Sequence, residues 1–199
     1  MKFLAPFTLA IASLTTASPI EPRAVTNFDG SQGVRLNLVN ASFGPDGGLY
    51  YKGMGLAQIY DKGKSLQAVQ AHSNPNVLTY GDLDRLSDPY PYITSKFTGS
   101  SGTFDLESFY YGCVLGNKPG NCVITVVGFR NGVKVAAASF SYEPVATIPA
   151  PMAQLRLTSA FRDIDSVRFT TVFSDSASHP GLGGATFLDD LRYTYFGSS

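Results

Sequence analysis

The sequence has little charge and no net charge. Of its 199 residues 15% are charged, with 15 basic and 15 acidic side chains. Helical bundles and coiled coils need long charged helix-forming segments, and the 20 glycines and 12 prolines argue further against them. A balanced charge also excludes the broad electrostatic footprint that binds nucleic acid or an anionic membrane. We therefore expect no nucleic-acid partner and no membrane partner.

Several enzyme motifs are missing as well. The two histidines, His72 and His179, form no His-x-His or His-Glu-x-x-His spacing. No serine lies in Gly-x-Ser-x-Gly, and the glycines at 53–55 and 181–184 do not open a helix after a parallel strand, as a phosphate loop does. A Ser-His-Asp site assembled from distant positions stays open.

The N-terminal segment predicts export. Residues 1–17 contain one charge, Lys2, then an apolar run, and then small residues including Thr15 and Ala17. The run is too short to span a bilayer and is typical of a secretory signal peptide, with a membrane anchor or buried helix as the alternative. No later run reaches about 18 consecutive apolar residues. We expect a signal peptide at 1–17, a short propeptide at 18–23 and one domain at 24–199, in a secreted, extracellular protein.

Two further features agree with export. Asn40-Ala41-Ser42 is an N-glycosylation acceptor, which predicts that Asn40 lies at the surface. The two cysteines, Cys113 and Cys122, flank a turn-rich stretch between two strand-like runs. Their spacing is not Cys-x-x-Cys, which disfavours a redox or metal pair. We expect a disulfide that clamps this hairpin and stabilises it by about 2–3 kcal/mol.

The chain from residue 24 onward consists almost entirely of strand-like runs bounded by Gly, Pro, Asn or Asp. Asn131-Gly132 supplies the residues that a tight hairpin turn needs. Residues 65–72 could form a short helix. The pattern predicts an all-β fold with two packed antiparallel sheets, a β-sandwich of jelly-roll type. The expected strands are 25–28, 33–43, 56–60, 76–80, 92–97, 103–115, 122–129, 133–142, 154–158, 166–173 and 185–196.

A family resemblance supports this architecture. The segments that carry it are FDLESFY (104–110), VITVVGFRNG (123–132), DIDSVRF (163–169) and TFLDDL (186–191), with TNFDG (26–30) and YYKGMGL (50–56) before them. In this order they resemble secreted jelly-roll domains of fungi and of bacterial PEP-CTERM-type extracellular proteins. Those domains are similar in architecture to carbohydrate-binding modules. The resemblance covers most of residues 26–195.

The Asp-Asp pair in FLDDL interrupts an apolar-alternating strand. By alternation Phe187, Asp189, Leu191 and Tyr193 share one face, which places Asp189 at a core position. A buried carboxylate needs a partner, and oxygen-ligated Ca²⁺ is one solution. The resemblance implies that the first and last strands meet, so that Asp29 and Asp189 share a structural calcium ion. The alternative is that Asp189 accepts backbone N–H bonds or pairs with an arginine.

Other carboxylates are weaker candidates. Asp105 and Glu107 lie two residues apart on one strand face, and the two carboxylates of a glycosidase stand about 5–9.5 Å apart. The alternative is that Asp105 and Glu107 are two charges on the solvent-facing side of a strand. Asp82, Asp84 and Asp88 do not fit the spacing of a calcium loop.

Paired tyrosines beside Gly, Pro and Asp are the strongest signal for a ligand. In each adjacent pair on a strand one ring faces inward and the other outward. An exposed Tyr ring can stack on the C–H face of a sugar while nearby Asp or Asn side chains bind its hydroxyls. Rings that pack under loops are the alternative. We expect the ligand-binding rings to be Tyr50, Tyr90, Tyr92 and Tyr111.

These observations predict a secreted, monomeric, non-catalytic protein that binds an extracellular glycan or cell-wall polymer. One alternative is an extracellular polysaccharide hydrolase or lyase, which needs a cleft with carboxylates of perturbed pKa. The other is a secreted effector that binds protein through an apolar patch.

Overall fold

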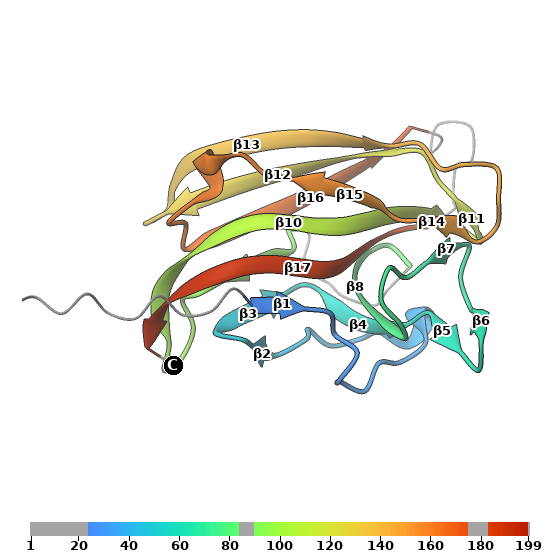
Figure 1. The fold of residues 1–199 in the computed structure, drawn as a ribbon, viewed down its shortest axis with the longest axis horizontal. Coiled ribbons are helices and arrows are strands. Elements are labelled where there is room, and N and C mark those ends of the chain that lie inside the picture. Colours follow the sequence, from blue (N-terminus) through green and yellow to red (C-terminus); the bar gives the residue numbers. More distant parts are fainter. Residues whose placement is uncertain (1–23, 84–89, 175–182, 199) are drawn as a thin grey trace, which may run out of the picture.

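The structure is a computed structural model that describes residues 24–83, 90–174 and 183–198. Two antiparallel sheets pack against each other, which confirms the predicted all-β jelly-roll sandwich (Figure 1). The predicted signal peptide (1–17) and propeptide (18–23) lie outside the described residues, as do His179, Asp84 and Asp88.

The first sheet, sheet A, has the strand order β11-β10-β17-β8-β4, with β1 paired to β17 and β15 paired to β10. Its strands are β1 (Ala24–Thr26), β4 (Gly55–Gln58), β8 (Asn76–Gly81), β10 (Ser101–Leu115), β11 (Lys118–Pro119), β15 (Ala153–Arg156) and β17 (Gly184–Ser198). The second sheet, sheet B, has the order β13-β12-β16-β9-β3-β2. Its strands are β2 (Pro45–Asp46), β3 (Leu49–Lys52), β9 (Tyr92–Thr94), β12 (Cys122–Arg130), β13 (Val133–Tyr142) and β16 (Ser166–Phe173).

Short elements connect these sheets. Two two-stranded pairs are formed by β5 (Tyr60–Asp61) with β6 (Lys64–Ser65), and by β7 (Val69–Gln70) with β14 (Ala150–Pro151). Two 3₁₀ turns complete the described elements, η1 (Leu36–Leu38) and η2 (Ser159–Phe161). No helix in the described ranges has the length and apolar character needed to cross a membrane.

The first and last strands lie side by side, as expected. Strand β1 pairs with β17 in the register Ala24 to Tyr193, and β10 runs along the other edge of β17 (Figure 1). Strand β8 pairs with the first half of β17 and β1 with its second half. The Asp189–Asp190 pair lies between these two partners.

Strands β12 and β16 show why alternation predicted this fold well. Their residues alternate between buried and more exposed positions, because one face packs on sheet A and the other faces solvent. Asn131 and Gly132 join β12 to β13 with φ of 49° and 76°, the positive values that this hairpin turn requires.

Two local predictions were wrong. Residues 33–43 contain the 3₁₀ turn η1 (Leu36–Leu38) rather than a strand, because the chain buries Leu36 and Val39, three positions apart, instead of alternating. Residues 65–72 contain the short strand β7 rather than a helix, and Val69 pairs with Ala150. Strand β3 was not predicted, because only four residues form it, between Gly47-Gly48 and Gly53.

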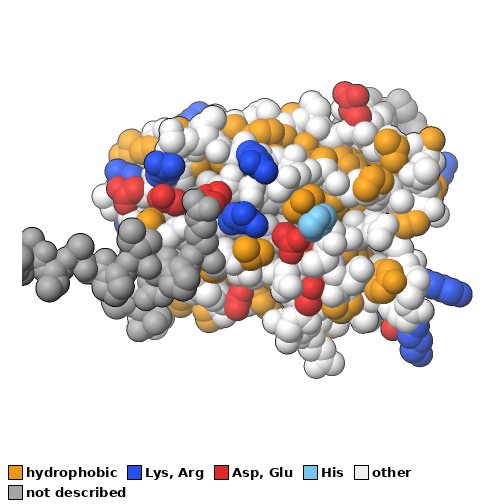
Figure 2. Space-filling model, in the orientation of Figure 1, with side chains coloured by type: hydrophobic (Ala, Val, Ile, Leu, Met, Phe, Trp, Pro, Cys, Tyr) orange, Lys and Arg blue, Asp and Glu red, His pale blue; other side chains and the backbone are white. Residues whose placement is uncertain are grey.

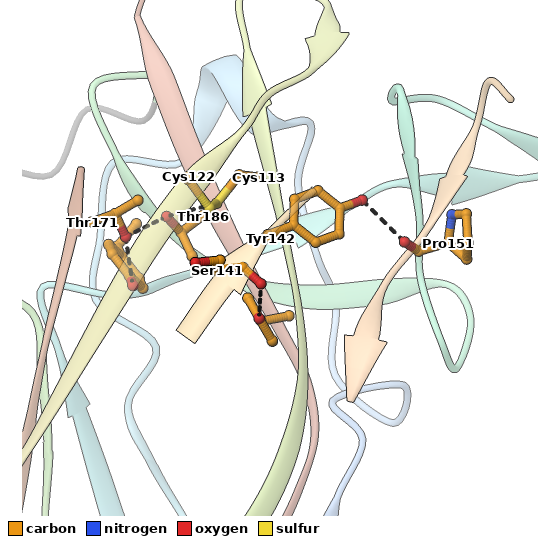
Figure 3. Close-up of a disulfide and its surroundings, with 9 residues drawn as sticks. Cys113, Cys122, Ser141, Tyr142, Pro151, Thr171 and Thr186 are labelled. Carbon is orange, nitrogen blue, oxygen red and sulfur yellow. Dashed lines mark hydrogen bonds between the residues drawn. A yellow bond between two sulfur atoms is a disulfide. The ribbon is translucent and has the colours of Figure 1, made fainter. Parts of the chain in front are cut away.

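The disulfide between Cys113 and Cys122 is present, but it does not clamp a hairpin (Figure 3). Cys113 belongs to β10 in sheet A and Cys122 to β12 in sheet B, with Cα atoms 6.4 Å apart. The chain pairs β11 back onto β10 before it crosses to the other sheet. The bridge therefore joins the two layers. Thr171 of β16 and Thr186 of β17 share a 2.7 Å hydrogen bond close to it.

Candidate functional site

Two of the predicted rings lie on the solvent-facing side of sheet B. Tyr50 of β3 and Tyr92 of β9 are both partly exposed, whereas their neighbours Tyr51 and Ile93 are buried in the core. Tyr51 pairs with Ile93, so Tyr50 and Tyr92 are diagonal neighbours on the same face. One ring of the Tyr50-Tyr51 pair faces the core and the other solvent, as alternation predicted, and the outward ring is Tyr50.

Cationic side chains accompany Tyr92. In the sheet register Tyr92 lies between Lys52 of β3 and Arg168 of β16. The Lys52 Nζ lies 5.5 Å from the centre of the Tyr92 ring. The Arg168 guanidinium lies 4.9 Å from the centre of the Phe129 ring on β12. Such contacts hold a cation and an aromatic face together.

We call the set Tyr50, Lys52, Tyr92, Phe129 and Arg168 the aromatic face of sheet B. Among the described residues the solvent-facing side of this sheet is open, since Lys52, Arg168 and Val172 are all exposed. Tyr90, just before β9, is 59% exposed. Phe97 packs against Tyr50 with ring centres 5.9 Å apart. The sequence analysis missed Phe129 and Arg168, although both occupy outward positions in alternating strands.

The prediction for Tyr111 was wrong. Its ring is 3% exposed and its hydroxyl donates to the Ser141 carbonyl at 2.7 Å, so it belongs to the core. The outward ring of the pair is Tyr110, which stacks on His72 with ring centres 3.4 Å apart and planes 15° apart. His72 Nδ1 in turn donates to Asp190 Oδ2 at 2.5 Å. Tyr110 is therefore covered by His72.

The Asp189–Asp190 pair lies at a β-bulge. Tyr110 pairs with Asp189 and Ser108 pairs with Arg192, so β17 has two residues where β10 has one. Asp190 has a φ of 47°, in the left-handed region. The extra residue changes which face of β17 each following side chain occupies.

This change corrects the expected position of Asp189. Thr186 bonds to Thr171 of sheet B, and Tyr193 also faces sheet B, donating to the Gly47 carbonyl at 3.1 Å. Seven positions separate them, an odd number that simple alternation would place on opposite faces. Asp189 therefore does not share a face with Tyr193, although it is completely buried.

Asp189 is held by hydrogen-bond donors. Ser73 donates its backbone N–H to Oδ2 at 2.8 Å and its hydroxyl to Oδ1 at 3.0 Å. The Asp190 N–H donates to Oδ1 at 2.8 Å. Burial, helped by the charge of Asp190 and opposed by these bonds, raises the pKa of Asp189 to about 7. These contacts fit the alternative in which Asp189 accepts backbone N–H bonds.

Asp29 lies in the same cluster. The Asn76 N–H donates to its Oδ1 at 3.4 Å, and the Ser73 side chain also bonds to it. Burial raises the pKa of Asp29, and the charge of Asp190 adds to this effect. Ser73 thus contacts both carboxyl groups that the sequence analysis placed together.

The donor set at this cluster has the oxygen chemistry that calcium prefers. Among residues 24–83, 90–174 and 183–198, however, no three His, Cys, Asp or Glu side chains group closely enough to hold a metal ion. The oxygens of Asp189 instead accept bonds from Ser73 and Asp190. Calcium at this cluster stays a prediction.

The paired carboxylates Asp105 and Glu107 line a groove on the outer face of sheet A. Asp105 Oδ1 accepts the Asp163 N–H at 2.7 Å, and its Oδ2 lies 3.9 Å from Arg162 Nε. Asp105 therefore anchors the turn before β16. Asn40 is exposed just after η1, where a glycan could be attached.

Comparisons with known proteins bear on the fold. A DUF4465 family protein from Bacteroides caccae has a TM-score of 0.50 and is 11% identical, covering 93% of this chain and 97% of its own. The module TmCBM61, solved with β-1,4-galactotriose, has a TM-score of 0.36 at 12% identity, covering 83% of this chain and 100% of its own. CBM28, described as specific for non-crystalline cellulose, has a TM-score of 0.33 at 12% identity, covering 71% of this chain and 87% of its own.

No family model matches the chain, and no curated protein matches it. The likeness to the DUF4465 protein supports the sandwich architecture alone. Kinship with the fungal and PEP-CTERM-type domains stays a prediction, and the ligand must be argued from the side chains of this chain.

Proposed function

We propose that the protein is a non-catalytic binder of an extracellular glycan or cell-wall polymer, and that the aromatic face of sheet B carries its site. One observation supports this most strongly. Three partly exposed rings, Tyr50, Tyr92 and Phe129, project from one open sheet face, with Lys52 and Arg168 beside them.

The chemistry of this face suits a sugar. The C–H face of a pyranose packs on an aromatic ring, and its hydroxyls need donors and acceptors nearby. Lys52 and Arg168 supply donors next to Tyr92, and the Tyr92 hydroxyl can donate or accept. Strands of a sheet hold these groups in place better than loops do.

The proposal extends to the setting of the protein. We propose that it is secreted, that Asn40 carries a glycan, and that calcium stabilises the cluster around Asp29 and Asp189. Export fits the disulfide that joins the two sheets, because such bridges persist in oxidising compartments.

The test is a binding screen of the purified protein against a glycan array and insoluble wall polysaccharides. We expect retention on one class of glycan, and a loss of about tenfold or more in affinity when Tyr92 or Tyr50 is replaced by alanine. Tyr60→Ala is the matched control, because Tyr60 lies on β5 outside both main sheets.

If glycan binding is equally strong in Tyr92→Ala, Tyr50→Ala and the control, the aromatic face of sheet B is not the binding site. No binding to any glycan by the folded protein would contradict the function itself. Thermal unfolding of each variant checks that the sandwich is intact.

A further inference from the structure

A groove runs over the outer face of sheet A, on the opposite sheet from the aromatic face. It has a volume of about 690 Å³ and lies over β10, β15 and β17, with η2 at its side. Figure 2 shows basic and acidic side chains interspersed over the β10–β17 part of this surface. Cavities of about 300–1,000 Å³ are the usual size of ligand sites.

The Ser108 hydroxyl lies at the floor of the groove, between two arginines. Ser108 of β10 pairs with Arg156 of β15 on one side and with Arg192 of β17 on the other. Residues directly opposite each other in antiparallel strands project from the same face. With strands about 4.8 Å apart, the two arginine Cα atoms stand about 10 Å apart across Ser108.

A second β-bulge, on β10, places Ser108 opposite Arg192. Leu106 pairs with Tyr193 and Ser108 with Arg192, so Glu107 is an extra residue. Its carbonyl accepts the Leu157 N–H at 2.8 Å, which holds the end of β15 against the bulge. Ser108 is 9% exposed, and no partner for its hydroxyl is found within the described part of the chain.

The two arginines are not used by the fold. Arg156 and Arg192 are exposed and have neither an ion pair nor a hydrogen bond with any described residue. The acid at the other end of the groove is already engaged, since Asp105 accepts the Asp163 N–H and faces Arg162. Glu107 also lines the groove, which therefore has three arginines and two acids.

Guanidinium groups bind oxyanions through paired N–H donors, and two guanidiniums flanking a hydroxyl form a site for one such group. Phe196, 41% exposed, lines the same groove and offers an apolar ring. We propose that this groove is a second binding site, separate from the aromatic face of sheet B, for a sugar chain that carries an oxyanion, either a carboxylate or a sulfate. Arg156, Ser108 and Arg192 bind the anionic group, and Phe196 packs against the sugar.

The test is a titration of the purified protein with three probes: de-esterified oligogalacturonate, the same oligomer fully methyl-esterified, and a heparin-derived oligosaccharide. We expect one or both anionic probes to bind, more tightly at low salt, and the esterified oligomer to bind at least tenfold more weakly. Binding of the first probe identifies a carboxylate as the anion, and binding of the third identifies a sulfate.

Arginine variants then locate the site. Arg156→Gln and Arg192→Gln should each weaken anion binding about tenfold to a hundredfold. Arg156→Lys should retain only part of the affinity, because an ammonium group lacks the paired N–H donors of a guanidinium. Arg35→Gln is the matched control, since Arg35 is exposed before η1, away from the groove. Tyr92→Ala should leave anion binding unchanged, which separates this test from that of the proposed function.

Unchanged affinity in Arg156→Gln and Arg192→Gln would overturn the proposal, as would equal binding of the charged and esterified oligomers. Failure of both anionic probes to bind the folded protein would overturn it as well. The thermal unfolding of the Arg156 and Arg192 variants should match that of the unmodified protein, because neither arginine supports the fold.

Discussion

Cys113 and Cys122, nine residues apart in the sequence, join the two sheets of the sandwich covalently. Cys113 lies near the end of β10 and Cys122 begins β12, so the bridge lies where the chain passes from one layer to the other. The two sheets otherwise meet mainly through apolar side chains of the core. The bridge therefore restrains the relative position of the layers.

Replacing both cysteines by alanine should lower the free energy of unfolding by about 2–3 kcal/mol, because the open chain gains entropy in the unfolded state. For a domain of this size the melting temperature should fall by about 5–10 °C. Scanning calorimetry with and without reductant measures both effects. A reductant should destabilise the unmodified protein and leave the double variant unchanged; a variant as stable as the oxidised protein would contradict this role.

The carboxyl of Asp189 should make stability depend on pH. Its pKa of about 7 in the folded protein exceeds its ordinary value, so the folded state binds a proton that the unfolded chain has released. The free energy of unfolding should therefore fall as the pH rises from about 4 through about 7, by up to about 4 kcal/mol.

Urea unfolding at about pH 5 and about pH 8, with chelator present, tests this slope. Asp189→Asn removes the titrating group, so the free energy of unfolding should fall less between these two pH values. Asp61→Asn, at an exposed carboxylate of β5, serves as the control and should retain the full fall. An equally steep fall in both variants would assign the slope to other groups.

The proposed calcium ion would bind the ionised carboxylates of Asp29 and Asp189, so calcium should act in the opposite direction to protons. We expect millimolar calcium to raise the melting temperature at about pH 8 and to have a smaller effect at about pH 5. The rise should disappear with chelator and in Asp29→Asn. A melting temperature that calcium leaves unchanged at both pH values would show that Ser73 and its neighbours satisfy these carboxyls alone.

Asn40 gives a prediction that needs no ligand. The protein recovered from the medium of a eukaryotic host should lose mass on treatment with an N-glycosidase, and Asn40→Gln should abolish that loss. Both forms should unfold at similar temperatures, because Asn40 is exposed in a loop. An unmodified Asn40 in protein recovered from the medium would contradict glycosylation.

The sheets of this fold could be predicted from the sequence wherever strands have one buried and one solvated face. Strand β16 has the same bounds as the expected strand at 166–173. Alternation failed for residues 33–43, where the 3₁₀ turn η1 buries Leu36 and the next residue after the turn, Val39, is buried as well. A stretch of apolar residues can satisfy either geometry, and contacts from distant strands decide between them.

The candidate sites were less accessible to sequence reasoning. Alternation predicted one outward ring in each tyrosine pair but not which ring it is, so Tyr50 was chosen correctly and Tyr111 was chosen in place of Tyr110. The bulge at Asp190 cannot be read from the residues around it, since it depends on the pairing of β17 with β10. Arg156 and Arg192 meet across Ser108 only because β15 and β17 flank β10.

The most direct test of the glycan site is an NMR titration of the labelled protein with the oligosaccharide that the binding screen retains. The account predicts that the largest shift changes fall on β3, β9 and β16, at Tyr50, Tyr92 and Arg168, and that Tyr92→Ala abolishes them. Shift changes confined to other parts of the surface, with β3, β9 and β16 unaffected, would contradict it.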